Sequence, residues 1–136
     1  MTNKVEVYFA LKGEDFDPDL FTEASGLVPS ESWKKGEKGR HVDFYKFGFW
    51  QLSEAIVEDD VVYVDEIAEK LVWKLEGKKE VIREFVNKYS LYSALAVVLH
   101  VSCNQETSTP ALGFKAQTIS FLSYVNAEID VDIYRN

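Results

Sequence analysis

The stretch KVEVYFALK, residues 4–12, decides the fold class because hydrophobic and polar side chains alternate along it. Successive side chains of a β-strand point to opposite faces of the sheet, so alternation indicates a strand with one buried face. The hydrophobic face carries Val5, Val7, Phe9 and Leu11, and the other face carries Glu6, Tyr8 and Ala10. The pattern predicts a half-buried strand that ends at Gly13.

Residues 128–134 alternate in the same way and predict a closing strand. The side chains expected to face the core are Ile129, Val131 and Ile133, and those expected on the opposite face are Asp130, Asp132 and Tyr134. If both strands belong to one sheet, its outer face collects tyrosines and carboxylates.

Between these strands, the spacing of hydrophobic residues predicts four helices and three further extended segments. The first helix begins after the N-cap Asp17, with Pro18 at its first position, and ends before Gly26. The other helices are expected over residues 64–75, 82–89 and 115–126, and the extended segments begin at Trp33, cover 43–52 and cover 91–103. Residues 91–103 are nearly all hydrophobic, which is typical of a central strand.

The resulting order is β-α-β-β-α-α-β-α-β, which predicts an α+β fold. We expect a single domain over residues 1–136, with one mostly antiparallel sheet of about five strands and helices packed on one face. Both ends of the chain contain a strand, a loop with a proline and a short helix, which indicates weak internal pseudo-symmetry.

The composition excludes several kinds of site and indicates the kind of partner. The chain has 136 residues, a net charge of −8 and one cysteine, Cys103, so an internal disulfide and a cysteine-based zinc cluster are excluded. Neither a signal peptide nor a membrane-spanning segment is predicted. We therefore expect a cytoplasmic protein that does not associate with a membrane. A net negative charge repels phosphate backbones and favours basic partners, although it also simply keeps a protein soluble.

No recognisable catalytic motif is present, and we expect a non-enzymatic protein without cofactor, metal or catalytic residues. Asp15, Asp17 and Asp19 do not continue into a calcium loop, since glycine and glutamate are missing at the required positions. His100 and Cys103 are three apart, so on a strand they would point to opposite faces, and Cys103 is expected to be a small buried residue.

A basic segment follows Trp33: Lys34, Lys35, Lys38 and Arg40. Stacking on Trp33 combined with phosphate contacts could bind single-stranded nucleic acid. The alternative is a solvated turn whose tryptophan packs on the sheet, and the overall negative charge favours it. We therefore expect no nucleic-acid partner.

The outer sheet face is the better candidate surface, because tyrosine and tryptophan anchor interfaces and carboxylates select a basic partner. The predicted binding residues are Tyr8, Trp33, Trp50, Asp130, Asp132 and Tyr134. The alternative is an ordinary solvated sheet face with aromatic cross-strand pairs.

Several segments together resemble a known family. They are Gly13, Phe16-Asp17-Pro18-Asp19, Gly26-Leu27-Val28-Pro29, Ser32-Trp33-Lys34-Lys35-Gly36-Glu37, Phe49-Trp50-Gln51-Leu52 and Ala127-Glu128-Ile129-Asp130-Val131-Asp132-Ile133-Tyr134. The chain is similar over nearly its whole length to the bacterial family labelled domain of unknown function 4279. The resemblance implies a small single-domain α+β bacterial protein and carries over no catalytic residue.

The charge layout and the lack of catalytic motifs favour a protein-binding domain, such as an immunity protein or an inhibitor of a basic partner. The alternative is a small-molecule sensor with a cleft between the sheet and the Trp33 loop. The sequence does not define the oligomeric state.

Overall fold

β1 (Asn3–Gly13) is the central strand of the sheet in the computed structural model, which describes residues 2–103 and 109–135. The alternating side chains Val5, Val7, Phe9 and Leu11 are completely buried beneath the helices, as the sequence predicts. β1 pairs with β3 (Gly48–Ser53) on one side and with β5 (Tyr92–Val101) on the other, both antiparallel. The first residues of β1 also pair with the short strand β4 (Val57–Asp59).

Within residues 2–103 and 109–135 the sheet has six strands in the order β2-β3-β1-β5-β6, with β4 beside β1. β2 (Glu31–Trp33) and β6 (Glu128–Arg135) form its two ends. β5 and β6 run parallel, and the remaining strand pairs are antiparallel. The predicted α+β class and the mostly antiparallel sheet are confirmed. The additional strand is β4, which lies in an acidic segment without an alternating pattern.

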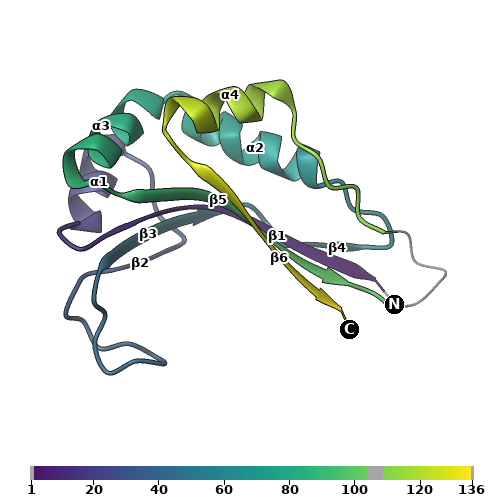
Figure 1. Cartoon of the computed structure of the whole chain (residues 1–136), viewed down its shortest axis with the longest axis horizontal. Coiled ribbons are helices and arrows are strands. Elements are labelled where there is room, and N and C mark those ends of the chain that lie inside the picture. Colours follow the sequence, from purple (N-terminus) through teal and green to yellow (C-terminus); the bar gives the residue numbers. More distant parts are fainter. Residues whose placement is uncertain (1, 104–108, 136) are drawn as a thin grey trace.

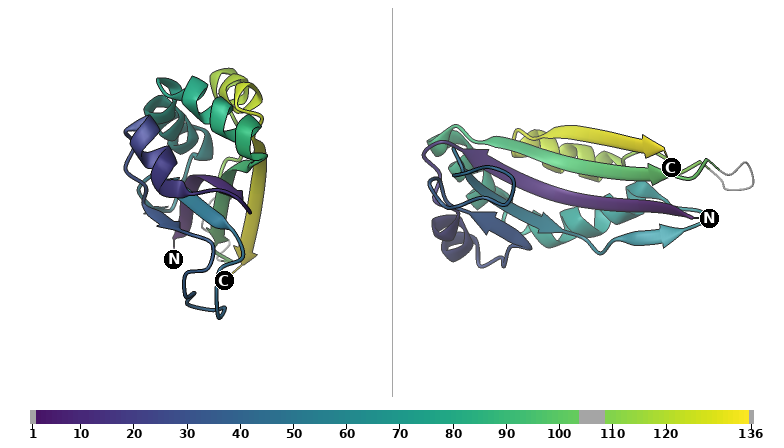
Figure 2. Two further views of the ribbon diagram at one scale, coloured as in Figure 1. Left: turned by 90° about the vertical axis from the view of Figure 1, so that its left-hand side faces the viewer. Right: turned by 90° about the horizontal axis from the view of Figure 1, so that it is seen from below.

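In the described part of the chain, four helices lie on one face of the sheet and none lies on the other face (Figures 1 and 2). They are α1 (Pro18–Ser25), α2 (Val64–Glu76), α3 (Lys79–Tyr89) and α4 (Ala116–Tyr124). Phe21 of α1 packs edge-on against Trp50 of β3 and Phe85 of α3, with ring centroids 4.7 and 5.2 Å away. This contact joins the small first helix to the main core.

The start and end of α1 match the sequence signals. The Asp17 side chain accepts a hydrogen bond from the Asp19 amide at 3.0 Å, and Pro18 occupies the first turn. Gly26 ends the helix at φ 73°, a left-handed conformation that glycine adopts without a steric penalty.

Details of the strands and of their exposure also differ from the sequence prediction. The strand at Trp33 ends there instead of beginning there, and residues 43–47 belong to the loop before β3. Ile129 and Ile133 do lie on the helix side, opposite the buried Leu95 and Leu99 of β5, but they remain 40% and 55% exposed. β6 lies at the end of the sheet, so only Val131 packs against the core.

The predicted internal symmetry corresponds to two β-α-β segments. In β1-α1-β2 the two strands run in the same direction, with β3 between them. In β5-α4-β6 the parallel strands are direct neighbours. None of the described helices is long and apolar enough to cross a membrane.

Candidate functional site: the open face of the sheet

The open face of the sheet, opposite the helices, is formed by the side chains that alternate with the buried ones. Paired residues on neighbouring strands share a face, so the register defines rows across it. One row runs from Tyr8 through Ala96 to Asp130, and the next from Glu6 through Val98 to Asp132. Tyr8, Asp130 and Asp132, predicted from β1 and β6 separately, therefore lie within two adjacent rows.

Two tyrosines of this face lie in a negative electrostatic field. Burial raises the pKa of Tyr8 above its ordinary value, and the charges of Glu6, Asp130 and Asp132 raise it further. The pKa of Tyr92 is raised by burial and by the charge of Glu128. We call these six residues the acidic tyrosine patch: Glu6, Tyr8, Tyr92, Glu128, Asp130 and Asp132.

The carboxylates of β6 are not among the acidic side chains that form salt bridges in the described part of the chain. Glu54 has a salt bridge to Lys74 at 3.0 Å, and Glu69 has one to Lys115 at 3.2 Å. Glu128 accepts a side-chain hydrogen bond from Tyr92, and within the described residues no salt bridge neutralises the charge of the β6 carboxylates.

Tyr134, the last predicted residue of this face, lies near the far end of β6. Its ring stacks on His100 of β5, with centroids 5.1 Å apart and an interplanar angle of 18°. The side chain is 52% exposed, so it extends the aromatic surface beyond the acidic tyrosine patch. His100 is thus a ring neighbour of Tyr134.

Trp50 was predicted on the open face and lies instead in the core. It pairs with Leu11 on the helix side of the sheet, is 0% exposed, and its indole nitrogen donates a hydrogen bond to Thr22 Oγ1 at 3.1 Å. The residue before it, Phe49, takes the open-face position. Trp50 therefore stabilises the fold and cannot contact a partner there.

Trp33 lies on the open face, but both faces of its ring are already covered. Tyr45 stacks on one side at 4.1 Å and Phe49 stacks at 4.2 Å, with interplanar angles of 11° and 15°. A nucleic-acid base needs a free ring face for stacking, and Trp33 offers none. Its ring instead fixes the β2–β3 loop against the sheet.

The β2–β3 loop extends on the side of the sheet opposite the helices (Figures 1 and 2). Lys34, at its start, has a salt bridge to Asp19 at 3.0 Å and lies 3.9 Å from Asp17, so it faces the beginning of α1. The hydrogen bond to Asp19 and the charge of Asp17 raise the pKa of Lys34. One cation of the basic segment is therefore already paired.

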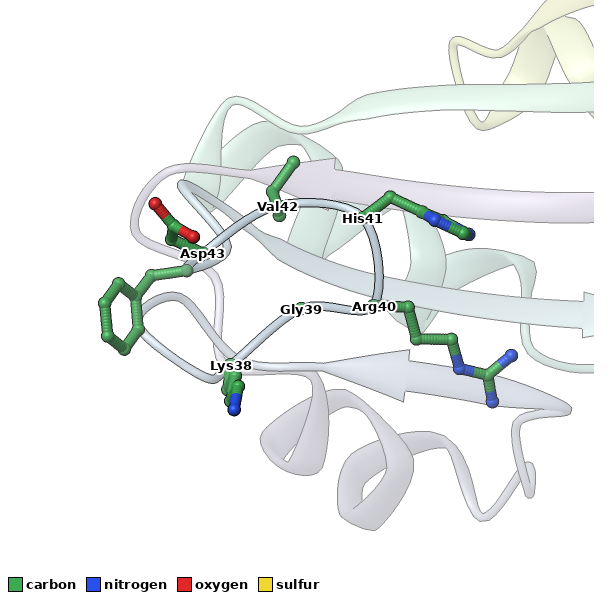
Figure 3. A pocket seen from close by; sticks show the side chains of 7 residues that line it. Lys38, Gly39, Arg40, His41, Val42 and Asp43 are labelled. Carbon is green, nitrogen blue, oxygen red and sulfur yellow. The ribbon is translucent and has the colours of Figure 1, made fainter.

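The tip of this loop encloses a hollow of about 570 Å³ lined by residues 38–44. The side chains of Arg40 and His41 extend outward on one side of the loop, and that of Lys38 points in a different direction (Figure 3). An anion site needs donors that converge on one point, so this arrangement does not favour phosphate or nucleic-acid binding.

The opposite-face argument for His100 and Cys103 does not apply, because Cys103 lies outside the strand that carries His100. β5 ends at Val101, and Cys103 follows it as an exposed free cysteine rather than the expected buried one. In residues 2–103 and 109–135, no three His, Cys, Asp or Glu side chains are grouped as a metal site.

Sequence reasoning missed three residues that the structure makes relevant. Tyr92 lies in the acidic tyrosine patch, and Lys12 lies between two rings, with its Nζ 5.1 Å from the Phe47 centroid and 5.2 Å from that of Tyr92. Trp73 on α2 is 79% exposed. Its place in the helical repeat, away from the hydrophobic face of α2, was the signal for this exposure.

Comparison with known proteins identifies the family. The family described as Domain of unknown function (DUF4279) matches residues 3–136, so the chain belongs to it, as its segments already indicated. No curated protein and no solved structure matches the chain. The family description names no activity.

Proposed function

We propose that this member of the family is a non-enzymatic domain that binds a basic protein through the acidic tyrosine patch, as an immunity protein or inhibitor does. The observation that carries the proposal is the grouping of two tyrosines and four carboxylates on a sheet face that none of the described helices covers. Tyrosines contribute contact area at a small cost in side-chain entropy, and the carboxylates select a cationic partner.

The net charge of −8 supports the same partner. A negative protein field speeds the encounter with a cationic protein and slows the encounter with nucleic acid. The covered faces of Trp33 and the divergent Lys38 and Arg40 side chains of the loop argue in the same direction. A reducing compartment such as the cytoplasm suits the exposed free thiol of Cys103.

Site-specific crosslinking tests the proposal. A photoreactive amino acid replaces Tyr92 in the patch, and in a second variant it replaces Trp73, an exposed aromatic residue of the helix layer. We expect the Tyr92 position to capture a protein of high isoelectric point in cells that express the chain. The yield should fall between 50 and 500 mM salt, because exposed charges are screened over a distance of about 10 Å at 0.1 M.

A charge variant supplies the matched control. The double variant Asp130→Asn with Asp132→Asn should reduce capture at Tyr92. The double variant Glu23→Gln with Glu84→Gln changes the net charge by the same amount on exposed parts of α1 and α3, and it should leave capture at Tyr92 unchanged. Capture of an acidic protein, or equal capture at Tyr92 and Trp73, would contradict the proposal.

A further inference from the structure

β6 presents the long free edge of the sheet. It contains eight residues and pairs through one side with β5, and within the described residues no strand pairs with its other side. The opposite end of the sheet is the three-residue strand β2. Natural proteins usually shorten or cover edge strands, because the unpaired amides and carbonyls of an edge recruit other strands.

The helix side of this edge is apolar and largely uncovered. Ile129 and Ile133 of β6 are 40% and 55% exposed, and Ile119 of α4 is 52% exposed. Ile119 and Ile129 also line an open groove of about 440 Å³ where α4 meets β6. Exposed isoleucines beside an unpaired edge provide the hydrophobic half of a binding surface.

We propose that the outer edge of β6 binds an extended segment of the basic partner as an added strand; this inference rests on the proposed function and specifies its geometry. Residues paired across two strands share a face. Cationic side chains of the segment would therefore lie opposite Glu128, Asp130 and Asp132, and apolar ones beside Ile129 and Ile133. The occupant is a segment in which lysine or arginine alternates with hydrophobic residues.

A second copy of the chain fits this edge poorly. In an antiparallel pair of two β6 strands centred on Val131, Asp130 of each copy would lie opposite Asp132 of the other. Like charges directly opposite one another are destabilising. A slip by one residue removes this clash but places the isoleucines on the wrong face. The charge pattern thus disfavours self-pairing and favours a basic strand.

The acetylated and amidated peptide KVKVKVKV is the probe for this geometry. Backbone hydrogen bonds to an added strand should slow amide hydrogen exchange in β6 at least tenfold at saturation, measured by NMR on the whole chain. Asp130→Asn with Asp132→Asn should weaken peptide binding about three- to tenfold, since each exposed ion pair contributes little. Glu23→Gln with Glu84→Gln is the control, because it changes the net charge by the same amount away from β6.

Two methylated peptides separate strand addition from charge attraction. Alternate amides of a strand point to opposite edges, so methylating the lysine amides and methylating the valine amides block different edges. One of the two peptides should lose binding while the other keeps it. Equal binding of both, or no binding of the parent peptide at 1 mM, would overturn the inference. If both methylated peptides still bind and Asp130→Asn with Asp132→Asn weakens the binding of both equally, strand addition at β6 is excluded. The proposed binding of a basic protein through the acidic tyrosine patch then remains supported.

Self-association gives the remaining outcome. The chain without peptide should sediment as a monomer in which the edge amides of β6 exchange rapidly. A dimer with protected β6 amides would show that a second copy occupies the edge and would overturn the inference.

Discussion

Replacing Trp33 by leucine tests whether this ring stabilises the β2–β3 loop. The ring forms two parallel stacks, at 4.1 Å with Tyr45 and at 4.2 Å with Phe49. An aromatic pair contributes about 0.5–1.5 kcal/mol beyond its buried area, so two pairs contribute about 1–3 kcal/mol. Leucine retains part of the hydrophobic burial. We therefore expect Trp33→Leu to lower the free energy of unfolding by about 1–3 kcal/mol.

A double-mutant cycle with Tyr45→Leu isolates one of the two stacks. The coupling energy between Trp33 and Tyr45 should be about 0.5–1.5 kcal/mol, measured by urea unfolding followed by far-ultraviolet circular dichroism. Phe44→Leu is the control, because Phe44 is the exposed neighbour of Tyr45 and its replacement should change stability by less than about 0.5 kcal/mol. A coupling energy near zero would refute the role given to Trp33.

Two further predictions concern the sheet. Gly48→Ala should destabilise the fold by several kcal/mol in urea unfolding, because a Cβ there would overlap the backbone carbonyl of Phe16. Asp130→Asn with Asp132→Asn should lower the pKa of Tyr8, followed by phenolate absorbance, yet leave it above 10.0 because burial is the larger cause. Since the folded-state pKa of Tyr8 lies above the unfolded value, its contribution to stability is complete below about pH 10 and is lost as the pH rises through the folded-state pKa.

Local patterns predicted most of the secondary structure. Alternation identified β1 and β6, and capping residues with helical spacing identified α1 and α2. β4 was missed because its three residues pair with β1 through backbone hydrogen bonds and carry no hydrophobic pattern. Such a strand depends on its neighbour rather than on its own side chains.

The open face could be predicted only in part. Phe49 and Trp50 are adjacent aromatics, so one must point to each face, but the sequence does not tell which. The register with β1, which sets Trp50 beside Leu11, determines it. The open-face position of Tyr92 could not be predicted for a related reason, since β5 is hydrophobic on both faces and its alternation is weak.

The exposure of Ile129 and Ile133 could not be predicted from their own strand. Their alternation is as regular as that of β1, and both sets of side chains do point to the helix side. What differs is position, since β1 is central and β6 is at the end of the sheet. Strand order arises from contacts that are distant in sequence, so local periodicity does not contain it.

The pairing of β1 with β5 also has a kinetic consequence. Tyr8 lies beside Ala96, a partner about 90 positions away along the chain. During synthesis β1 therefore leaves the ribosome long before its main hydrogen-bonding partner exists. Domains dominated by such distant contacts fold slowly for their size, because the entropy cost of closing a large loop comes before the stabilising contacts form. The hydrophobic β1 strand must remain soluble, or be held by a chaperone, until most of the domain has been synthesised.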